Sequence, residues 1–313
     1  MKHIIESQQF TLDFLNQVYQ LSDEMRNDAS PYQLNGKILA TLFFEPSTRT
    51  RLSFESAMHK LGGSVISTEK AEEFSSHSKG ESLEDSIKVL SRYADVIALR
   101  HFEIGSAKRA ARVSSVPLIN AGDGAGQHPS QSLLDLYTIK RKFGQIDELT
   151  ICMVGDLLYG RTVRSLCYLL GRFYKVKLLF VAPQICRMGA DIKQFLDEQK
   201  VHWEEIEDFE EALKQSDCIY MTRIQKERFL DMGRYESACN LFKIDAQKLD
   251  ILKKDAIVMH PLPRLEEIAV EVDDDPRMHF FEQAANGVWV RMSIISMLLN
   301  PDLALGEKVG DLF

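Results

Sequence analysis

Cysteine is scarce in this sequence, and long apolar segments are absent. Five cysteines are scattered over 313 residues and form no CxxC pair, so the sequence predicts neither a zinc site nor a disulfide framework. We expect reduced and mostly buried thiols. No apolar run approaches the ~18 residues that a membrane-spanning helix needs, and residues 1–6 lack the apolar stretch of a signal peptide. We therefore expect a cytoplasmic protein.

Nucleotide-binding motifs are also missing. Neither GxxxxGKS/T nor GxGxxG occurs near the end of a predicted strand. The formal net charge of -8 argues against a general nucleic-acid-binding role, although it leaves room for a local cationic pocket that binds a small anion. A chain of 313 residues is long for one core and comfortable for two domains of roughly 150 residues each.

Apolar runs of strand length alternate with helical patterns along the chain. We expect strands over 38–44, 65–67, 94–99, 116–120, 149–154, 177–181, 201–205, 218–221 and 256–259. Helices are expected over 48–61, 82–92, 130–143, 162–173, 191–200, 209–215 and 284–299. This alternation predicts the α/β class, with parallel sheets covered on both faces.

The pattern restarts after a polar stretch at residues 140–148. We expect two doubly wound domains, each a parallel sheet flanked by helices, and helices that join the two domains. The first domain is expected to contain residues 1–130 and 287–313, and the second residues 131–286.

The most informative segment is 44–51, Phe-Glu-Pro-Ser-Thr-Arg-Thr-Arg. A buried strand ends here, and Ser47 stands where a helix N-cap belongs. The first helical turn then carries Thr48, Arg49 and Thr50, whose free N–H groups, hydroxyls and guanidinium suit a phosphate. A plain Ser-capped helix with a solvated arginine explains the same residues, and the segment alone leaves both alternatives open.

This turn and four later segments closely resemble the aspartate-specific branch of the carbamoyltransferase family. The later segments are Arg100-His101, Asn120 to Gln131, Tyr220 to Phe229, and His260-Pro261-Leu262-Pro263-Arg264. The resemblance extends from about Ser30 to the C-terminus without a large gap. It implies transfer of the carbamoyl group of carbamoyl phosphate to the α-amine of L-aspartate, giving N-carbamoyl-L-aspartate and phosphate, a step of pyrimidine biosynthesis.

The resemblance implies that the first domain binds carbamoyl phosphate. Its phosphate would be held by Ser47, Thr48, Arg49 and Thr50. The carbamoyl oxygen and the oxyanion would be stabilised by Thr50, Arg100 and His128, with Gln131 near the carbamoyl nitrogen. Chemically, Arg100 follows an apolar strand and so lies at the sheet edge where such folds bind ligands. A histidine in the position of His128 is as often structural as functional.

The resemblance implies that the second domain binds aspartate. Two carboxylates need at least two planar donors, and arginines follow two predicted strands at Arg161 and Arg223. Each arginine alone also fits a surface ion pair. The resemblance assigns the aspartate carboxylates to Arg161, Arg223 and Gln225, and the substrate amines to the backbone carbonyls of Leu262 and Pro263.

Two further segments permit two interpretations each. The polar loop 74–81 fits a solvated loop, whereas the resemblance implies that Ser75 and Lys79 complete the active site of a neighbouring subunit, where Lys79 also meets aspartate, in a homotrimer. The stretch 104–115 carries Lys108, Arg109 and Arg112. It fits a solvated helix face or a contact for an acidic partner such as a regulatory chain.

No side chain is placed by the sequence as the general base, and the resemblance implies that the departing phosphate takes the proton. The reaction needs no metal and no organic cofactor. One departure from the family is Phe102, which replaces a common proline after Arg100-His101. Two alternatives stay open: a carbamoyltransferase for another amine such as ornithine, and a non-catalytic scaffold subunit of the same family.

Overall fold

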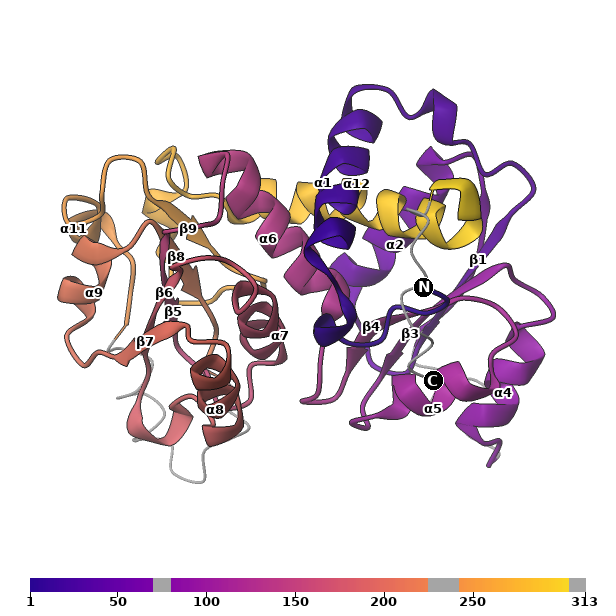
Figure 1. Cartoon of the computed structure of the whole chain (residues 1–313), viewed down its shortest axis with the longest axis horizontal. Helices are drawn as coiled ribbons and strands as arrows, with labels where there is room; N and C mark the ends of the chain where they lie inside the picture. Colours follow the sequence, from indigo (N-terminus) through magenta and orange to yellow (C-terminus); the bar gives the residue numbers. More distant parts are fainter. Residues whose placement is uncertain (70–79, 225–241, 304–313) are drawn as a thin grey trace. The chain divides into compact units, whose positions relative to one another are not determined.

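The computed structural model describes residues 1–69, 80–224 and 242–303, and the chain divides into two compact units. Unit 1 contains Met1–Tyr137 and Ala285–Phe313, and unit 2 contains Thr138–Ala284. Helix α6 (Pro129–Phe143) begins in unit 1 and ends in unit 2, whereas helix α12 (Phe280–Leu299) runs from unit 2 into unit 1 (Figure 1). Helices therefore join the two units, as the sequence predicted.

Unit 1 is built on a four-stranded sheet with the order β2-β1-β3-β4, in which all neighbours are parallel. Its strands are β1 (Ile38–Phe43), β2 (Ser64–Glu69), β3 (Val96–His101) and β4 (Leu118–Asp123). From β1 the chain passes to β2 at one edge and then returns to the other side of β1 for β3 and β4. The switch point of this sheet therefore lies between β1 and β3.

Helices cover both faces of this sheet (Figure 1). One face carries α4 (Leu83–Leu90) and α5 (Ser106–Val113), whose apolar side chains form one buried cluster with Ala40 and Leu42 of β1. The opposite face carries α1 (Leu12–Asn27) and α2 (Thr48–Lys60), and on this side Thr41 of β1 donates to Glu55 of α2 over 3.1 Å. Alternate residues of one strand thus face two helical layers, as expected for a doubly wound sheet.

Unit 2 contains a five-stranded parallel sheet with the order β7-β6-β5-β8-β9. Its strands are β5 (Thr150–Val154), β6 (Lys177–Val181), β7 (His202–Glu205), β8 (Cys218–Met221) and β9 (Ile257–Met259). The remaining helices are α7 (Arg161–Leu170), α8 (Ala190–Glu198), α9 (Phe209–Gln215) and α11 (Ala246–Leu249). The chain passes from β5 outward to β6 and β7 and then returns to β8, so the switch point lies between β5 and β8.

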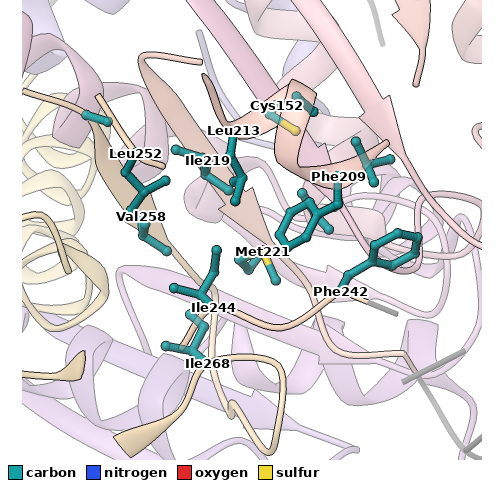
Figure 2. Close-up of a cluster of buried hydrophobic side chains, with 14 of the residues drawn as sticks. Cys152, Phe209, Leu213, Ile219, Met221, Phe242, Ile244, Leu252, Val258 and Ile268 are labelled. Atoms are coloured by element: carbon teal, nitrogen blue, oxygen red, sulfur yellow. The ribbon is translucent and has the colours of Figure 1, made fainter. Parts of the chain in front are cut away.

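The two faces of this sheet also bury different side chains. On one face, Cys152 of β5 and Met221 of β8 pack with Phe209 and Leu213 of α9 (Figure 2). On the other face, the Sγ atom of Cys167 in α7 lies 3.5 Å from the Sδ atom of Met153 in β5. The two doubly wound units confirm the predicted fold class.

The strands lie close to their predicted ranges, whereas several element ends differ. Strand β3 extends to His101, and helix α12 already begins at Phe280. Helix α1 was not predicted. Four cysteines (Cys152, Cys167, Cys186 and Cys218) are buried and in no disulfide bond, as expected, and Cys239 lies outside the described residues.

Within the described ranges, no helix is long and apolar enough to cross a membrane. The same residues contain no group of three or more His, Cys, Asp or Glu side chains that could hold a metal ion.

Candidate active site

The residues predicted to bind phosphate lie at the switch point of the unit 1 sheet. Strands β1 and β3 are paired in parallel so that Phe43 stands beside Arg100, and the Phe44 N–H donates to the Arg100 carbonyl over 2.9 Å. The turn that carries Ser47 to Thr50 follows β1 directly. The sheet therefore places Arg100 next to the start of this turn, at the edge where doubly wound sheets bind ligands.

Helix α2 begins at Thr48 without a side-chain cap, since the Ser47 hydroxyl caps nothing. The Ser47 N–H donates to Oε1 of Glu69 over 3.2 Å, and the first bond of the helix runs from the Arg51 N–H to the Ser47 carbonyl over 3.0 Å. The N–H groups of Thr48, Arg49 and Thr50 have no carbonyl one turn earlier in the helix. They are therefore available, with the positive end of the helix dipole, to bind an anion.

The two arginines of this turn differ in their partners. Arg51 forms ion pairs with Glu55 at 3.1 Å and with Glu69 at 3.2 Å. Arg49, by contrast, makes no hydrogen bond or ion pair within the described residues, and partial burial lowers the pKa of its guanidinium. An arginine remains protonated at neutral pH even so. Arg49 is thus the cation of this turn that can accept an anionic ligand.

Arg100 is held at the end of β3 by a carboxylate. Its Nε lies 3.5 Å from Oε2 of Glu45, which comes two residues before Ser47. The ring of His101, the next residue, is buried between the rings of Phe44 and Phe102, at centroid distances of 4.5 and 4.2 Å. Phe102, the departure from the family, therefore packs on His101 and leaves Arg100 at the strand end.

A loop organised by Asp123 leads from β4 to His128. The Asp123 carboxylate accepts from the N–H groups of Gly105 over 2.9 Å and Gln127 over 2.8 Å. His128 is buried directly before α6, and its Nδ1 lies 3.4 Å from the hydroxyl of Ser130. This fixed loop places His128 beyond the carboxyl end of β4.

The residues predicted to bind the substrate aspartate lie near the switch point of the unit 2 sheet. Strands β5 and β8 pair Val154 with Met221, and Thr222 then ties the two chain segments together. Its N–H and its hydroxyl both donate to the Val154 carbonyl over 2.8 Å, and its hydroxyl accepts from the Asp156 N–H over 3.0 Å. A Cβ atom on Gly155 would lie 2.3 Å from the Thr222 carbonyl oxygen, so only glycine fits this crossing.

Arg161 and Arg223 both follow this crossing. Arg161 is the first residue of α7, where the N-cap is Gly160 and no side chain caps the helix. Arg223 directly follows Thr222, is partly exposed, and makes no hydrogen bond or ion pair within the described part of the chain. Arg161 thus begins the helix that follows β5, and Arg223 comes two residues after the neighbouring strand β8. Gln225, their predicted companion, lies outside the described residues.

The segment after β9 is held by His260. The Nδ1 atom of this buried ring accepts from the Leu262 N–H over 2.8 Å, so Nε2 carries the hydrogen and donates to Oε1 of Glu267 over 2.8 Å. Burial raises the pKa of Glu267, but the hydrogen bonds from His260 and from the backbone N–H groups outweigh burial and leave this pKa below its usual value. Leu262 has φ +58° and its peptide bond to Pro263 is cis. The motif histidine therefore fixes the backbone predicted to bind the substrate amines.

Other predicted residues have structural partners or lie outside the described ranges. Arg264 of the same motif forms an ion pair with Asp273 and lies 4.7 Å above the ring of Phe280. Ser75 and Lys79 are outside the described residues.

The basic stretch forms helix α5. There Arg109 pairs at 2.9 Å with both Glu84 and Glu103, so its charge is neutralised within unit 1.

The carboxylates that hold the site residues in place were not predicted from the sequence. Glu45, Asp123 and Asp135 were not singled out, although each contacts or precedes a predicted site residue. For Asp123 a signal was present, because aspartate beside glycine is typical of a turn that hydrogen-bonds its own backbone. For the buried Asp135 the helical spacing of four residues from Gln131 was the signal.

Each of the two α/β units carries arginines near the switch point of its sheet, as the sequence predicted for a transferase that binds two anionic substrates. The chain matches the family model of the aspartate/ornithine carbamoyltransferase carbamoyl-P binding domain over residues 2–141, and that of the Asp/Orn binding domain over residues 147–298. The chain therefore belongs to the aspartate/ornithine carbamoyltransferase family.

Individual relatives are similar over nearly the whole chain. Aspartate carbamoyltransferase 3, chloroplastic, from Pisum sativum is 51% identical over 95% of this chain and 77% of its own length. The catalytic subunit of M. jannaschii aspartate transcarbamoylase is 45% identical, with a TM-score of 0.90 over 98% of this chain and 100% of the other. Trypanosoma cruzi aspartate transcarbamoylase, solved with carbamoyl phosphate and aspartate, is 38% identical, with a TM-score of 0.89 over 95% of this chain and 97% of the other.

Proposed function

We propose that this chain transfers the carbamoyl group of carbamoyl phosphate to the α-amine of L-aspartate and releases N-carbamoyl-L-aspartate and phosphate. The observation that carries the proposal is the pair of cationic groups at the two switch points. Unit 1 offers a helix start without a side-chain cap together with Arg49, which has no partner among the described residues, and unit 2 offers Arg161 and Arg223. The T. cruzi relative, solved with these two substrates, has the same fold at 38% identity.

In unit 1 the phosphate binds to Ser47, Thr48, Arg49 and Thr50 at the start of α2. Thr50, Arg100 and His128 donate to the carbamoyl oxygen, which becomes negative when the tetrahedral intermediate forms. Each such donor is worth roughly 10²–10³ in turnover, because it acts on charge that develops in the transition state. Gln131 meets the carbamoyl nitrogen.

In unit 2 the two carboxylates of aspartate bind to Arg161, Arg223 and Gln225, and the carbonyls of Leu262 and Pro263 accept from its amine. Carbamoyl phosphate binds first. The neutral amine then forms a C–N bond with the carbamoyl carbon, the bond from that carbon to the phosphate oxygen breaks, and the departing phosphate takes the proton. Binding energy holds both anions in place, so that a bimolecular reaction becomes an effectively unimolecular one.

The choice of acceptor decides between this proposal and its main alternative. Ornithine carries a cationic side chain, which is not compatible with a site of two arginines. We expect carbamoylated product when the protein is incubated with labelled carbamoyl phosphate and aspartate, and little product with ornithine. Product from ornithine alone would overturn the proposal, and the absence of product from any amine would favour a non-catalytic scaffold.

We also propose a homotrimer in which Ser75 and Lys79 of one subunit serve the active site of the next, Lys79 reaching both substrates. The support is the match of these two residues to the family pattern. Mixing inactive Lys79→Ala chains with inactive Arg49→Ala chains should restore some activity, because some sites then receive no substituted residue. Verified mixed trimers that stay inactive would refute the shared site.

Two further properties are proposed and have their own tests. Regulatory chains would add to the native mass of the complex after co-expression with neighbouring genes. A cytoplasmic location predicts activity in the cytosolic fraction of the source cell, whereas the Pisum sativum relative is chloroplastic by name.

A further inference from the structure

A buried carboxylate lies directly behind the predicted carbamoyl site. Asp135 of α6 has no exposed surface, and its Oδ1 accepts from the Nε2 of Gln131 over 2.8 Å. The two residues are four positions apart on one helix, so they share a face. The reaction described above uses Gln131 but gives Asp135 no role.

A buried arginine lies in the same part of unit 1 as Asp135. Arg291 of α12 is 3% exposed, and its guanidinium carbon lies 4.9 Å from the ring centre of Phe54 in α2. Burial lowers the pKa of Arg291 to about 10, an effect that the negative charge of Asp135 opposes. An unpaired buried charge is strongly unfavourable, whereas two opposite charges support each other.

A glycine makes room for this arginine. Gly287 lies one turn before Arg291 on α12, and a Cβ atom there would come within 2.3 Å of Nη1 of Arg291 and 3.1 Å of Cδ2 of Leu134. The guanidinium therefore occupies the space that any other residue at 287 would fill. Within unit 1, α2 and the unit 1 parts of α6 and α12 thus meet around one arginine.

The hydrogen bond from Nε2 of Gln131 to Oδ1 of Asp135 determines which way the Gln131 amide faces. A carboxylate only accepts hydrogen bonds, so the NH₂ end of the amide must point toward Asp135. The amide oxygen is then the atom left for a ligand. An oxygen in this position can accept a hydrogen bond from an NH₂ group but forms no hydrogen bond with a methyl group.

We propose that Asp135, supported by Arg291, is a positioning residue that orients Gln131 so that its Oε1 accepts from the carbamoyl NH₂ and selects carbamoyl phosphate over acyl phosphates of the same shape. This inference rests on the proposed function. Asp135 touches no substrate and acts only through Gln131. An ordinary hydrogen bond would give roughly tenfold discrimination.

Acetyl phosphate tests this selection, because it replaces the NH₂ group by a methyl group and reacts through the same bonds. The measurement is kcat/KM for each donor at fixed aspartate, in wild type and in Asp135→Asn. The asparagine is isosteric and can donate, so Gln131 can turn its amide over. We expect the preference for carbamoyl phosphate to fall by roughly tenfold, mainly through the carbamoyl phosphate value.

A double-mutant comparison separates orientation from general damage. Gln131→Met should abolish the same preference, and adding Asp135→Asn to it should change the ratio no further. Asp23→Asn is the matched control, because Asp23 also bonds a side chain of α6, the Tyr137 hydroxyl, over 2.6 Å. It should leave the ratio unchanged.

If Asp135→Asn lowers kcat/KM equally for carbamoyl phosphate and acetyl phosphate, or leaves the ratio of the two values unchanged for any other reason, the inference is overturned. If Asp135→Asn does not fold, Gly287→Ala displaces Arg291 instead and should reduce the same ratio. An unchanged ratio in that variant would again refute it. A wild-type protein that makes no carbamoyl aspartate would refute the proposed function, which is a separate outcome.

Discussion

His128 is buried directly before α6, at the end of a loop held by Asp123. We predict that His128→Ala lowers kcat by roughly 10²–10³, because an oxyanion donor acts on charge that is absent from the bound substrate. Binding of carbamoyl phosphate, measured by calorimetry, should weaken much less. His128→Gln keeps a donor and should retain more activity. Near-wild-type kcat in His128→Ala would show that the histidine is structural.

The buried cysteines give a second prediction at this scale. Burial raises the pKa of Cys152 to about 12 and that of Cys167 further still, so at pH 8 only about 10⁻⁴ of Cys152 is thiolate. We expect iodoacetamide to label none of the four described cysteines in the native protein and all of them in denaturant. Peptide mapping by mass spectrometry distinguishes the positions. Rapid native labelling of Cys152 or Cys167 would contradict their burial.

Individual site residues could be predicted where a short motif carries them. The turn from Ser47 to Thr50 combines a strand end, a helix start and a cation within four positions, so neighbouring residues predict its chemistry. Arg291 could not be found in this way, because its partner Asp135 is distant in the sequence and only folding brings the two charges together. The difference between Arg49 and Arg51 also depends on Glu69, a residue of another strand.

At the scale of elements, the crossing of β5 and β8 is the feature most sensitive to change. Gly155 has φ +110°, and a Cβ atom there would overlap the Thr222 carbonyl. We predict that Gly155→Ala destabilises the protein and raises KM for aspartate, since it displaces Thr222 and the adjacent Arg223. Binding of carbamoyl phosphate by unit 1 should persist.

A matched variant separates the overlap from the backbone strain. Gly144 has φ +75°, but a Cβ atom there meets nothing within 4 Å. Gly144→Ala should therefore show only the strain of a left-handed residue, about 1–2 kcal/mol in the free energy of unfolding, with an unchanged KM for aspartate. Equal KM values for the two variants would show that the crossing does not position the aspartate group. Urea unfolding and steady-state kinetics measure both effects.

Apolar runs predicted the strands well, because buried parallel strands are continuous hydrophobic segments. Helix α1 was overlooked, although Leu15, Val18 and Met25 lie at helical spacing and Thr11 caps its start. The end of β3 was predicted two residues early because Arg100 and His101 are polar. Pairing with β1 and β4 extends the strand through them, which only the neighbouring strands determine.

At the scale of the whole molecule, both units follow one plan. Each is a parallel sheet whose switch point carries arginines beside a helix without a side-chain cap. The alternation of strands and helices predicted this class. Helices α6 and α12 each pass from one unit to the other, so both divisions between the units fall inside a helix, the first of them a few residues before the polar stretch 140–148.

Under the proposed function, the switch point of unit 1 binds carbamoyl phosphate and that of unit 2 binds aspartate. Calorimetric binding to Arg49→Ala and Arg223→Ala tests it most directly, with aspartate titrated in the presence of carbamoyl phosphate. We predict that Arg49→Ala strongly weakens the binding of carbamoyl phosphate. Arg223→Ala should leave the binding of carbamoyl phosphate unchanged and abolish measurable binding of aspartate. Equal loss of carbamoyl phosphate binding in both variants would contradict the account.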